Sequence, residues 1–143
     1  MLIKPDAVRD RAVGRIIARV EAEGFALRGL RMVRLLPDQA EAFYHEHAGK
    51  PFYPGLVAFM ASGPTVALLL EREDAVSRLR AIIGATDSRL AAPGTIRAEF
   101  GTDNHVNAVH ASDSVTSAKR ETAFFFGEPD TIPLAEAGTS QGA

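Results

Sequence analysis

The sequence predicts an α+β or α/β fold, in which helices alternate with about four strands. Three observations lead to this prediction. Short apolar or alternating runs of strand length are separated by stretches whose apolar residues recur at helical spacing. Glycine, proline or a candidate helix cap stands at most boundaries between them. A length of 143 residues fits one domain with a substantial core. The long connections between strands leave the strand order open.

The first half of the chain begins with a predicted strand end at residues 1–3, because Pro5 lacks an N–H and restrains the residue before it. We expect Asp6 or Asp10 to cap the following helix and Gly24 to end it. The apolar positions that define this helix and the strand after it are Val13, Ile16, Ile17 and Val20, followed by residues 27–36.

The middle of the chain is predicted to be mainly helical. Pro37 begins a helical region that ends before Gly49. A turn-rich connection, a short helix, a buried strand and a third main helix are then expected at residues 50–55, 56–60, 65–70 and 74–83. Residues 84–100 lack clear periodicity, and long ordered loops of this kind tend to be functional.

Composition limits the possible partners. The chain has no cysteine, which excludes disulfides and thiolate metal sites and fits a reducing cytosol. It shows no basic leader and no apolar run approaching the roughly 18 residues of a membrane span. A net charge of -2 offers no general attraction for nucleic acid. We therefore expect a cytoplasmic protein with no membrane or specific nucleic-acid partner, whose anion binding is local.

The candidate reaction centre is His110, which follows a short apolar run and precedes a helix start. Read as a strand, residues 106–111 place alternate side chains on opposite faces, and residues 112–114 supply candidate caps for a helix over 115–126. Such a junction offers free N–H groups and a positive helix end to a phosphate, and neutral imidazole is a competent nucleophile. Glu121 is placed to reach back and fix the tautomer of the ring. A hydrogen-bonded structural histidine is the alternative interpretation.

A protein metal cage is not expected. His105 and His110 suggest a metal site together with Asp103 and Asp113, but residues five apart in a strand face opposite sides. A divalent cation is better expected on the phosphates of a nucleotide.

Phosphates would have to be neutralised by side chains, because no glycine-rich phosphate motif occurs. Side chains at or beside element boundaries are candidates for this role, although a residue of this kind taken alone is more often a solvated surface group; these are Lys4, Arg80, Thr86 and Arg97. Phe52 or Tyr53 could stack on a base.

Residues 107–114, Asn-Ala-Val-His-Ala-Ser-Asp-Ser, resemble the active-site signature of the nucleoside diphosphate kinase family. Further segments resemble that family in its order and spacing, namely residues 3–8, 50–56, 62–64, 83–86 and 93–97. The resemblance runs from about residue 2 to residue 128. It predicts a nucleoside diphosphate kinase-like domain over residues 1–128 and a loosely held C-terminal tail over 129–143.

The resemblance implies a ferredoxin-like βαββαβ fold, with a four-stranded antiparallel sheet covered by helices, in a homo-oligomer that is usually a tetramer or hexamer. The implied activity belongs to nucleotide metabolism. It is ping-pong transfer of the γ-phosphoryl group from a nucleoside triphosphate such as ATP to a nucleoside diphosphate, with Mg²⁺ on the β- and γ-phosphates.

The resemblance also implies roles for individual residues. His110 would be the nucleophile that forms a phosphohistidine, Glu121 would hold and polarise its ring, and Ser112 would lie beside them. The positions that match the family's phosphate contacts are Lys4, Tyr44, Arg80, Thr86 and Arg97, with His47 as a lesser contact. Asn107 and Lys4 would bind the ribose hydroxyls, and Phe52 would stack on the base.

Three departures from the family pattern leave alternatives open. The first strand is short, residues 87–90 replace an Asn-Pro pair found in many relatives, and Ala111 stands where glycine is commonest. A nucleotide-binding or interaction module with little turnover, caused by a truncated first strand, is one alternative function. A phosphohistidine carrier that passes phosphate to a protein is another, but the dispersed basic and aromatic positions favour a small nucleotide.

Overall fold

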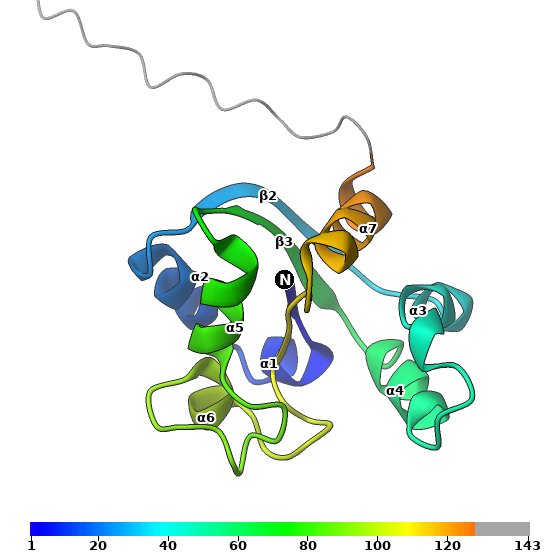
Figure 1. Ribbon diagram of the computed structural model, residues 1–143. Coiled ribbons are helices and arrows are strands. Elements are labelled where there is room, and N and C mark those ends of the chain that lie inside the picture. Colours follow the sequence, from blue (N-terminus) through cyan, green and yellow to red (C-terminus); the bar gives the residue numbers. More distant parts are fainter. Residues whose placement is uncertain (128–143) are drawn as a thin grey trace, which may run out of the picture.

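Residues 1–127 are described by the computed structural model, and within them four antiparallel strands form one sheet (Figure 1). The strands are β1 (Leu2–Ile3), β2 (Ala26–Val33), β3 (Thr65–Glu71) and β4 (Val109–His110), in the order β2-β3-β1-β4. Together with the helices between them, this order and direction confirm the predicted ferredoxin-like α+β fold. The predicted tail over residues 129–143 lies outside the described part of the chain.

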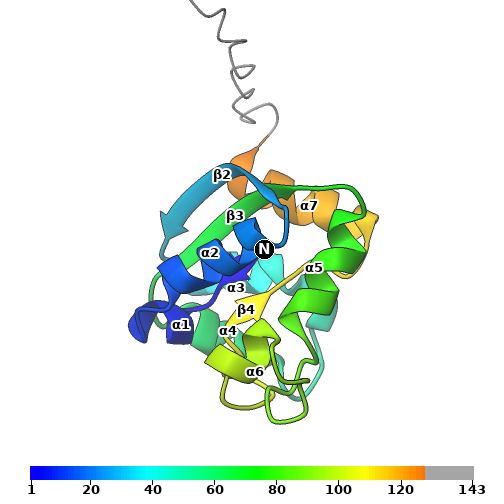
Figure 2. The same ribbon diagram turned by 90° about the vertical axis from the view of Figure 1, so that its left-hand side faces the viewer.

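Helices cover both faces of the sheet (Figures 1 and 2). They are α1 (Pro5–Arg9), α2 (Val13–Ala22), α3 (Pro37–Phe43), the 3₁₀ helix η1 (His45–His47), α4 (Tyr53–Met60), α5 (Ala75–Ile83), α6 (Ile96–Phe100) and α7 (Val115–Phe126). Side chains from α1, α2, α5 and α6 pack on one face, and those from α3, α4 and α7 pack on the other. None of the helices within residues 1–127 has the length and apolar character needed to cross a membrane.

The strand alternation determines which core each residue joins. Ile3 and Val66 pack against α1, α2 and α5, whereas Leu2 and Ala67 pack against α3, α4 and α7. Because both faces are covered, the first four residues of β3 are buried, as its continuous apolar sequence predicts. Strand β1 lies between β3 and β4, with Leu2 paired with His110. The interior position of β1 therefore fixes where His110 emerges from the sheet.

The predicted cap of the first helix by Asp6 or Asp10 is wrong, whereas the predicted helix end at Gly24 and the predicted cap at Ser114 are confirmed. No side chain caps α1 or α2, and the carboxylate of Asp6 instead accepts a hydrogen bond from the Ala108 amide at 3.0 Å. A tertiary partner has thus displaced the local cap. Gly24, with φ at 87°, follows the end of α2 as predicted. The predicted cap at Ser114 accepts a hydrogen bond from the Ser117 amide at 3.0 Å.

The structure differs from the sequence prediction in two segments, residues 84–100 and residues 106–111. Helix α6 forms within the first, where the Thr95 hydroxyl accepts from the Ala98 amide. Strand β4 contains two residues, because Ala108 adopts φ 69° and interrupts the extended backbone. The predicted alternation over residues 106–111 is therefore wrong outside β4.

Candidate active site

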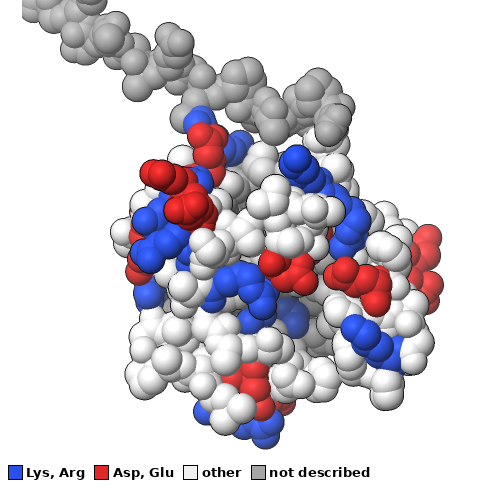
Figure 3. Space-filling model, viewed as in Figure 1, with Lys and Arg blue, Asp and Glu red and all other residues white. Residues whose placement is uncertain are grey.

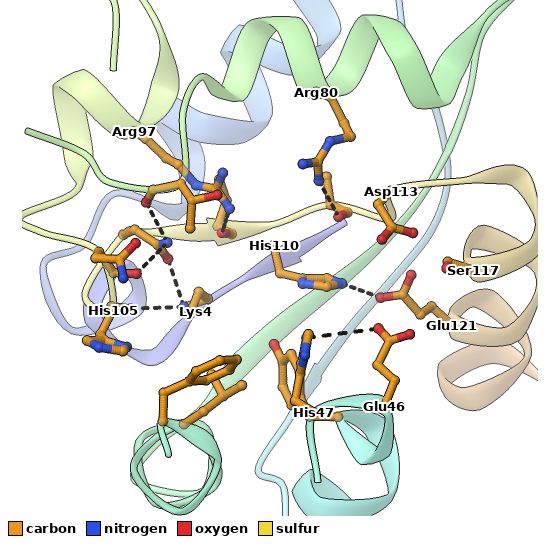
Figure 4. A pocket seen from close by; sticks show the side chains of 18 residues that line it. Lys4, Glu46, His47, Arg80, Arg97, His105, His110, Asp113, Ser117 and Glu121 are labelled. Atoms are coloured by element: carbon orange, nitrogen blue, oxygen red, sulfur yellow. Dashed lines mark hydrogen bonds and ion pairs between the residues drawn. The ribbon is translucent and has the colours of Figure 1, made fainter. Parts of the chain in front are cut away.

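A cavity of about 370 Å³ opens where β1, β4, α5, α6 and α7 approach η1 and α4 (Figure 4). Side chains far apart in the sequence line it, and they include every predicted site residue except Ser112: Lys4, Tyr44, His47, Phe52, Arg80, Thr86, Arg97, Asn107, His110 and Glu121. Figure 3 shows Lys and Arg side chains gathered in a hollow near the middle of this face, with Asp and Glu at its margin. A chain with net charge -2 thus concentrates positive charge locally, as anion binding requires.

His110 points into this cavity from β4, and Glu121 reaches its ring from the second turn of α7 (Figure 4). The Nε2 atom of His110 is hydrogen-bonded to the Glu121 carboxylate. Phe43 and Tyr44 contact the ring edge-on, with centroids 5.4 and 5.6 Å away. The ring is therefore fixed on several sides. Because Nε2 is occupied by a carboxylate, its proton stays there and Nδ1 keeps a free lone pair.

The protonation states of this pair suit a nucleophile. Burial lowers the pKa of His110, although the hydrogen bond to Glu121 opposes this effect. Burial raises the pKa of Glu121, but the hydrogen bond and charge of His110 outweigh it, so the net pKa of Glu121 lies below its ordinary value. At neutral pH the pair is a neutral imidazole beside a carboxylate. A positive charge that develops on the ring during attack would be stabilised by that carboxylate.

Lys4 and Asn107 form a hydrogen-bonded network on the opposite side of the cavity. Lys4 Nζ donates to Asn107 Oδ1 at 2.7 Å and to the His105 carbonyl at 3.0 Å, while Asn107 Nδ2 donates to the Thr86 carbonyl at 2.9 Å. Lys4 is only 5% exposed, and burial lowers the pKa of its amine from 10.5 to about 8. The network joins β1, the Thr86 loop and the segment before β4 into one rigid wall.

Two guanidinium groups approach the cavity from above His110 in Figure 4. Arg97 is 6% exposed, and its Nη1 and Nη2 atoms donate to the carbonyls of Gly84 at 3.1 Å and Val109 at 3.0 Å. Arg80 Nη1 donates to the Ala111 carbonyl at 3.3 Å. Burial and the neighbouring charge of Arg80 lower the pKa of Arg97 to about 10, so it stays charged at neutral pH. A buried guanidinium with a second, exposed one beside it favours an anionic ligand.

The outer end of the cavity is aromatic. The ring of His47 lies between those of Tyr44 and Phe52, with centroid distances of 6.3 and 5.3 Å. Phe52 is 39% exposed and also lines an adjoining cavity of about 200 Å³, together with His105. An exposed aromatic face beside an apolar cavity is suited to stacking with a planar ring such as a nucleobase.

Ser112 lies beside His110 and Glu121 but not in the main cavity, and several residues that line the main cavity were not predicted. Ser112 lies outside the main cavity and lines a small neighbouring space of about 20 Å³ that His110 and Glu121 also border. Its hydroxyl contributes to the lowered pKa of Glu121, so it acts on the carboxylate side of the pair. The cavity residues that were not predicted are Glu46, Leu56, Asn104, His105, Val109, Ala111, Asp113 and Ser117. Among them, Asp113 and Ser117 could have been predicted, because both lie at the start of α7, close in sequence to His110.

Ala111 does not distort the backbone beside His110. Its φ is not positive, so a side chain is accommodated there without left-handed strain. It is 4% exposed, and its carbonyl accepts the hydrogen bond from Arg80. Ala111 is thus accommodated without strain, and its carbonyl helps to orient the Arg80 guanidinium.

The described residues, 1–127, contain no group of three His, Cys, Asp or Glu side chains that could hold a metal ion. The carboxylates around the cavity are separated, with Glu121 engaged by His110 and Glu46 near His47. A divalent cation at this site would therefore have to take most of its ligands from the phosphates of a bound nucleotide and from water.

Comparison with known proteins adds an independent line of evidence. The family model described as nucleoside diphosphate kinase matches residues 1–131. The nucleoside diphosphate kinase of Aquifex aeolicus is 48% identical, with a TM-score of 0.89 over 92% of this chain and 95% of that one. The halophilic nucleoside diphosphate kinase of Halobacterium salinarum, in complex with CDP, is 39% identical, with a TM-score of 0.88 over 92% and 88% of the two chains. That of Encephalitozoon cuniculi is 35% identical, with a TM-score of 0.89 over 94% and 90%.

Proposed function

Because the chain belongs to the nucleoside diphosphate kinase family of phosphotransferases and has that family's function, we propose that His110 carries the phosphoryl group between its two nucleotides. The observation that carries this proposal is the orientation of the His110 ring. Its Nε2 atom is held by Glu121, and its other nitrogen is left free in a basic cavity.

In the first half-reaction, the Nδ1 lone pair attacks the γ-phosphorus of a nucleoside triphosphate. The N–P bond forms as the bond from phosphorus to the bridging oxygen breaks, and the diphosphate leaves with that electron pair. Glu121 stabilises the charge that develops on the imidazole. In the second half-reaction, a terminal oxygen of another nucleoside diphosphate attacks the phosphohistidine and returns His110 to its neutral form.

The remaining side chains position the phosphates rather than take part in bond making. Arg80 and Arg97 lie beside His110, where they would neutralise the transferred group, and Tyr44 and Thr86 line the same space. Lys4 and Asn107 would bind the phosphates and the ribose hydroxyls. Phe52 would stack on the base, with His47 as a lesser contact. Stacking contacts the face of the base and not its hydrogen-bonding edge, which favours the use of nucleotides with different bases.

Mg²⁺, homo-oligomeric assembly and a cytoplasmic location complete the proposal. When bound with the nucleotide, Mg²⁺ would offset negative charge on the β- and γ-phosphates. Assembly is supported by the edge strand β2, where Leu30 and Met32 are 49% and 60% exposed. The absence of cysteine fits a reducing compartment.

Incubation with ATP, followed by intact mass measurement, tests the proposed intermediate. We expect one added phosphate per chain, because His110 is neutral, oriented and accessible from the cavity. The adduct should be lost in acid, and addition of a second nucleoside diphosphate should remove it and yield the matching triphosphate. Peptide mapping should place the phosphate on residue 110. An unphosphorylated chain, or an adduct on another histidine, would contradict the proposal.

The same assay separates this function from the two alternatives. A binding module with little turnover would be stabilised thermally by nucleotides but would not exchange phosphate between them. A carrier for a protein would form the adduct but keep it when a nucleoside diphosphate is added. The short strand β1 is paired on both sides and holds Lys4 in the cavity wall, which favours an active enzyme.

The pH dependence of kcat/KM is expected to show two limbs. His110 must be neutral to attack, and because its pKa is lowered, activity should persist on acidification until the pH falls below the ordinary histidine value. Lys4 must be charged to bind phosphate, and burial lowers its pKa to about 8, so kcat/KM should fall as the pH rises through about 8.

Initial rates across roughly pH 5 to 10 would measure both limbs. Lys4→Arg is the matched control, because an arginine side chain does not lose its proton near pH 8, so the fall in kcat/KM at that pH should disappear, whatever the absolute rate. An alkaline limb that stays in place in this variant would contradict the role of Lys4.

A further inference from the structure

The carboxylate of Asp6 is a buried charged group that the proposed reaction does not use. Asp6 is 1% exposed and does not line the main cavity. Its Oδ2 atom accepts the hydrogen bond from the Ala108 amide, and its Oδ1 atom has no partner among the described residues. Burying a carboxylate is costly unless its interactions compensate. The one hydrogen bond that this carboxylate accepts within residues 1–127 is therefore expected to be important.

Ala108 has an unfavourable backbone conformation. Its φ of 69° lies in the left-handed region, which residues with a side chain rarely adopt because the Cβ atom crowds the carbonyl oxygen. Such a conformation persists only where the surroundings determine it. A local hydrogen bond from the Val109 amide to the Asn107 carbonyl at 2.8 Å closes the turn around Ala108, and two hydrogen bonds to residues 4–6 hold this turn in place. The Lys4 amide donates to the Ala108 carbonyl at 2.8 Å, and Asp6 accepts from the Ala108 amide at 3.0 Å.

The residues on both sides of Ala108 belong to the active site. Asn107 precedes it, and its side chain is hydrogen-bonded to Lys4 and to the Thr86 carbonyl. Val109 follows it, and its carbonyl accepts from Arg97 at 3.0 Å, directly before His110. A change in the Ala108 backbone would thus move the proposed ribose contact relative to the nucleophile.

We propose that Asp6 is a positioning residue, whose carboxylate holds Ala108 in its positive-φ turn and thereby fixes His110 relative to Asn107 and Lys4. This inference rests on the proposed function, because its consequence is a faster phosphoryl transfer. It assigns Asp6 no contact with the nucleotide. The small misplacements that it prevents are enough to slow a reaction that depends on orientation.

A double-mutant cycle between residues 6 and 108 tests the inference. The four proteins are wild type, Asp6→Asn, Ala108→Gly and the double variant. The measurement is the rate of phosphoenzyme formation at saturating ATP, divided by the final phosphorylated fraction so that inactive protein does not contribute. Asp6→Asn weakens the hydrogen bond by removing its charge, and we expect a rate loss of roughly 10- to 100-fold.

Glycine at residue 108 should rescue this loss. Glycine adopts positive φ without crowding, so it needs no carboxylate to hold it. In the Asp6→Asn background, Ala108→Gly is expected to raise the rate roughly 5- to 30-fold, the range set by the relief of left-handed crowding. Asp6 also lies close to Lys4 and raises the pKa of its amine, but a role confined to that charge would give no rescue by glycine.

Asp10→Asn is the matched control. Asp10 follows the same helix, is exposed and pairs with Arg9, so the same loss of charge there should not slow phosphoenzyme formation. If Asp6→Asn folds poorly, its melting temperature will show this, and the normalised rate still reports on the folded fraction. An unchanged rate of phosphoenzyme formation in Asp6→Asn would overturn the inference. So would a rate loss on Asp6→Asn that is the same whether residue 108 is alanine or glycine. A wild-type chain that forms no phosphoenzyme would instead refute the proposed function, and this inference with it.

Discussion

Replacement of His110 by glutamine should reduce phosphoryl exchange between nucleotides by about 10⁵- to 10⁶-fold, as loss of a nucleophile does in other covalent catalysts. Glutamine is close to histidine in size and can still hydrogen-bond to Glu121, so the variant should fold. Its amide nitrogen has no lone pair available for attack, because that pair is delocalised into the carbonyl group. The covalent route is thereby removed while the cavity stays intact.

Nucleotide binding provides the internal control for this variant. The proposed phosphate and ribose contacts would come from other residues, so Kd for ATP, measured by calorimetry, should change by less than about tenfold, or 1.4 kcal/mol. His45→Gln is the matched control, because His45 lies on η1, is exposed and does not line the main cavity. That variant should exchange phosphate at the wild-type rate. Substantial exchange by His110→Gln would show that the phosphate passes directly between nucleotides or through another residue.

The pair formed by His110 and Glu121 could be predicted from local sequence, whereas most of the surrounding wall could not. A strand end followed by caps and a helix determines where residue 121 points, and the observed contact confirms that prediction. The hydrogen bond between Lys4 and Asn107 joins residues 103 positions apart. This bond depends on β1 lying beside β4. The spacing of apolar residues predicts where strands are, but it does not predict which strands are neighbours when long connections separate them. Local sequence offered Lys4 only as one of several candidates at element boundaries, and the shared role of Lys4 and Asn107 was implied by the family resemblance.

The errors at Asp6 and Ala108 have a shared physical cause. Capping and alternation rules are local, and both assume that a polar side chain near a helix start serves that helix and that a strand stays extended. The partner of Asp6 is a backbone amide 102 residues away. No glycine marks the left-handed conformation of Ala108, so its sequence gives no sign of it. The exceptions to local rules thus meet at the segment that precedes the nucleophile.

Arg97→Ala is expected to reduce kcat by about 10²- to 10³-fold, or about 2.7–4 kcal/mol, by analogy with the loss of a donor that stabilises a transition state. Arg97 is already fixed by the carbonyls of Gly84 and Val109, so its charge needs no reorganisation when the γ-phosphoryl group moves toward His110. Affinity for ATP should fall by less than kcat, because in the proposed mode of binding Arg80 and Lys4 would still contact the phosphates in the ground state. Arg97→Lys should recover only part of the rate, since the single nitrogen of an ammonium cannot span the Gly84 and Val109 carbonyls in the fixed planar geometry that Nη1 and Nη2 of the guanidinium provide.

Three measurements separate this catalytic effect from damage to the fold. The rate of phosphoenzyme formation and the equilibrium Kd distinguish loss of transition-state stabilisation from loss of binding. Unfolding in urea measures the cost of leaving two buried carbonyls without their donor, which should be about 1–3 kcal/mol. Arg89→Ala is the matched control, because Arg89 is exposed, pairs with Asp87 and does not line the main cavity. A weakened affinity at unchanged kcat would show that Arg97 binds the ground state equally well, and the preorganised cation would then have no special part in the transfer.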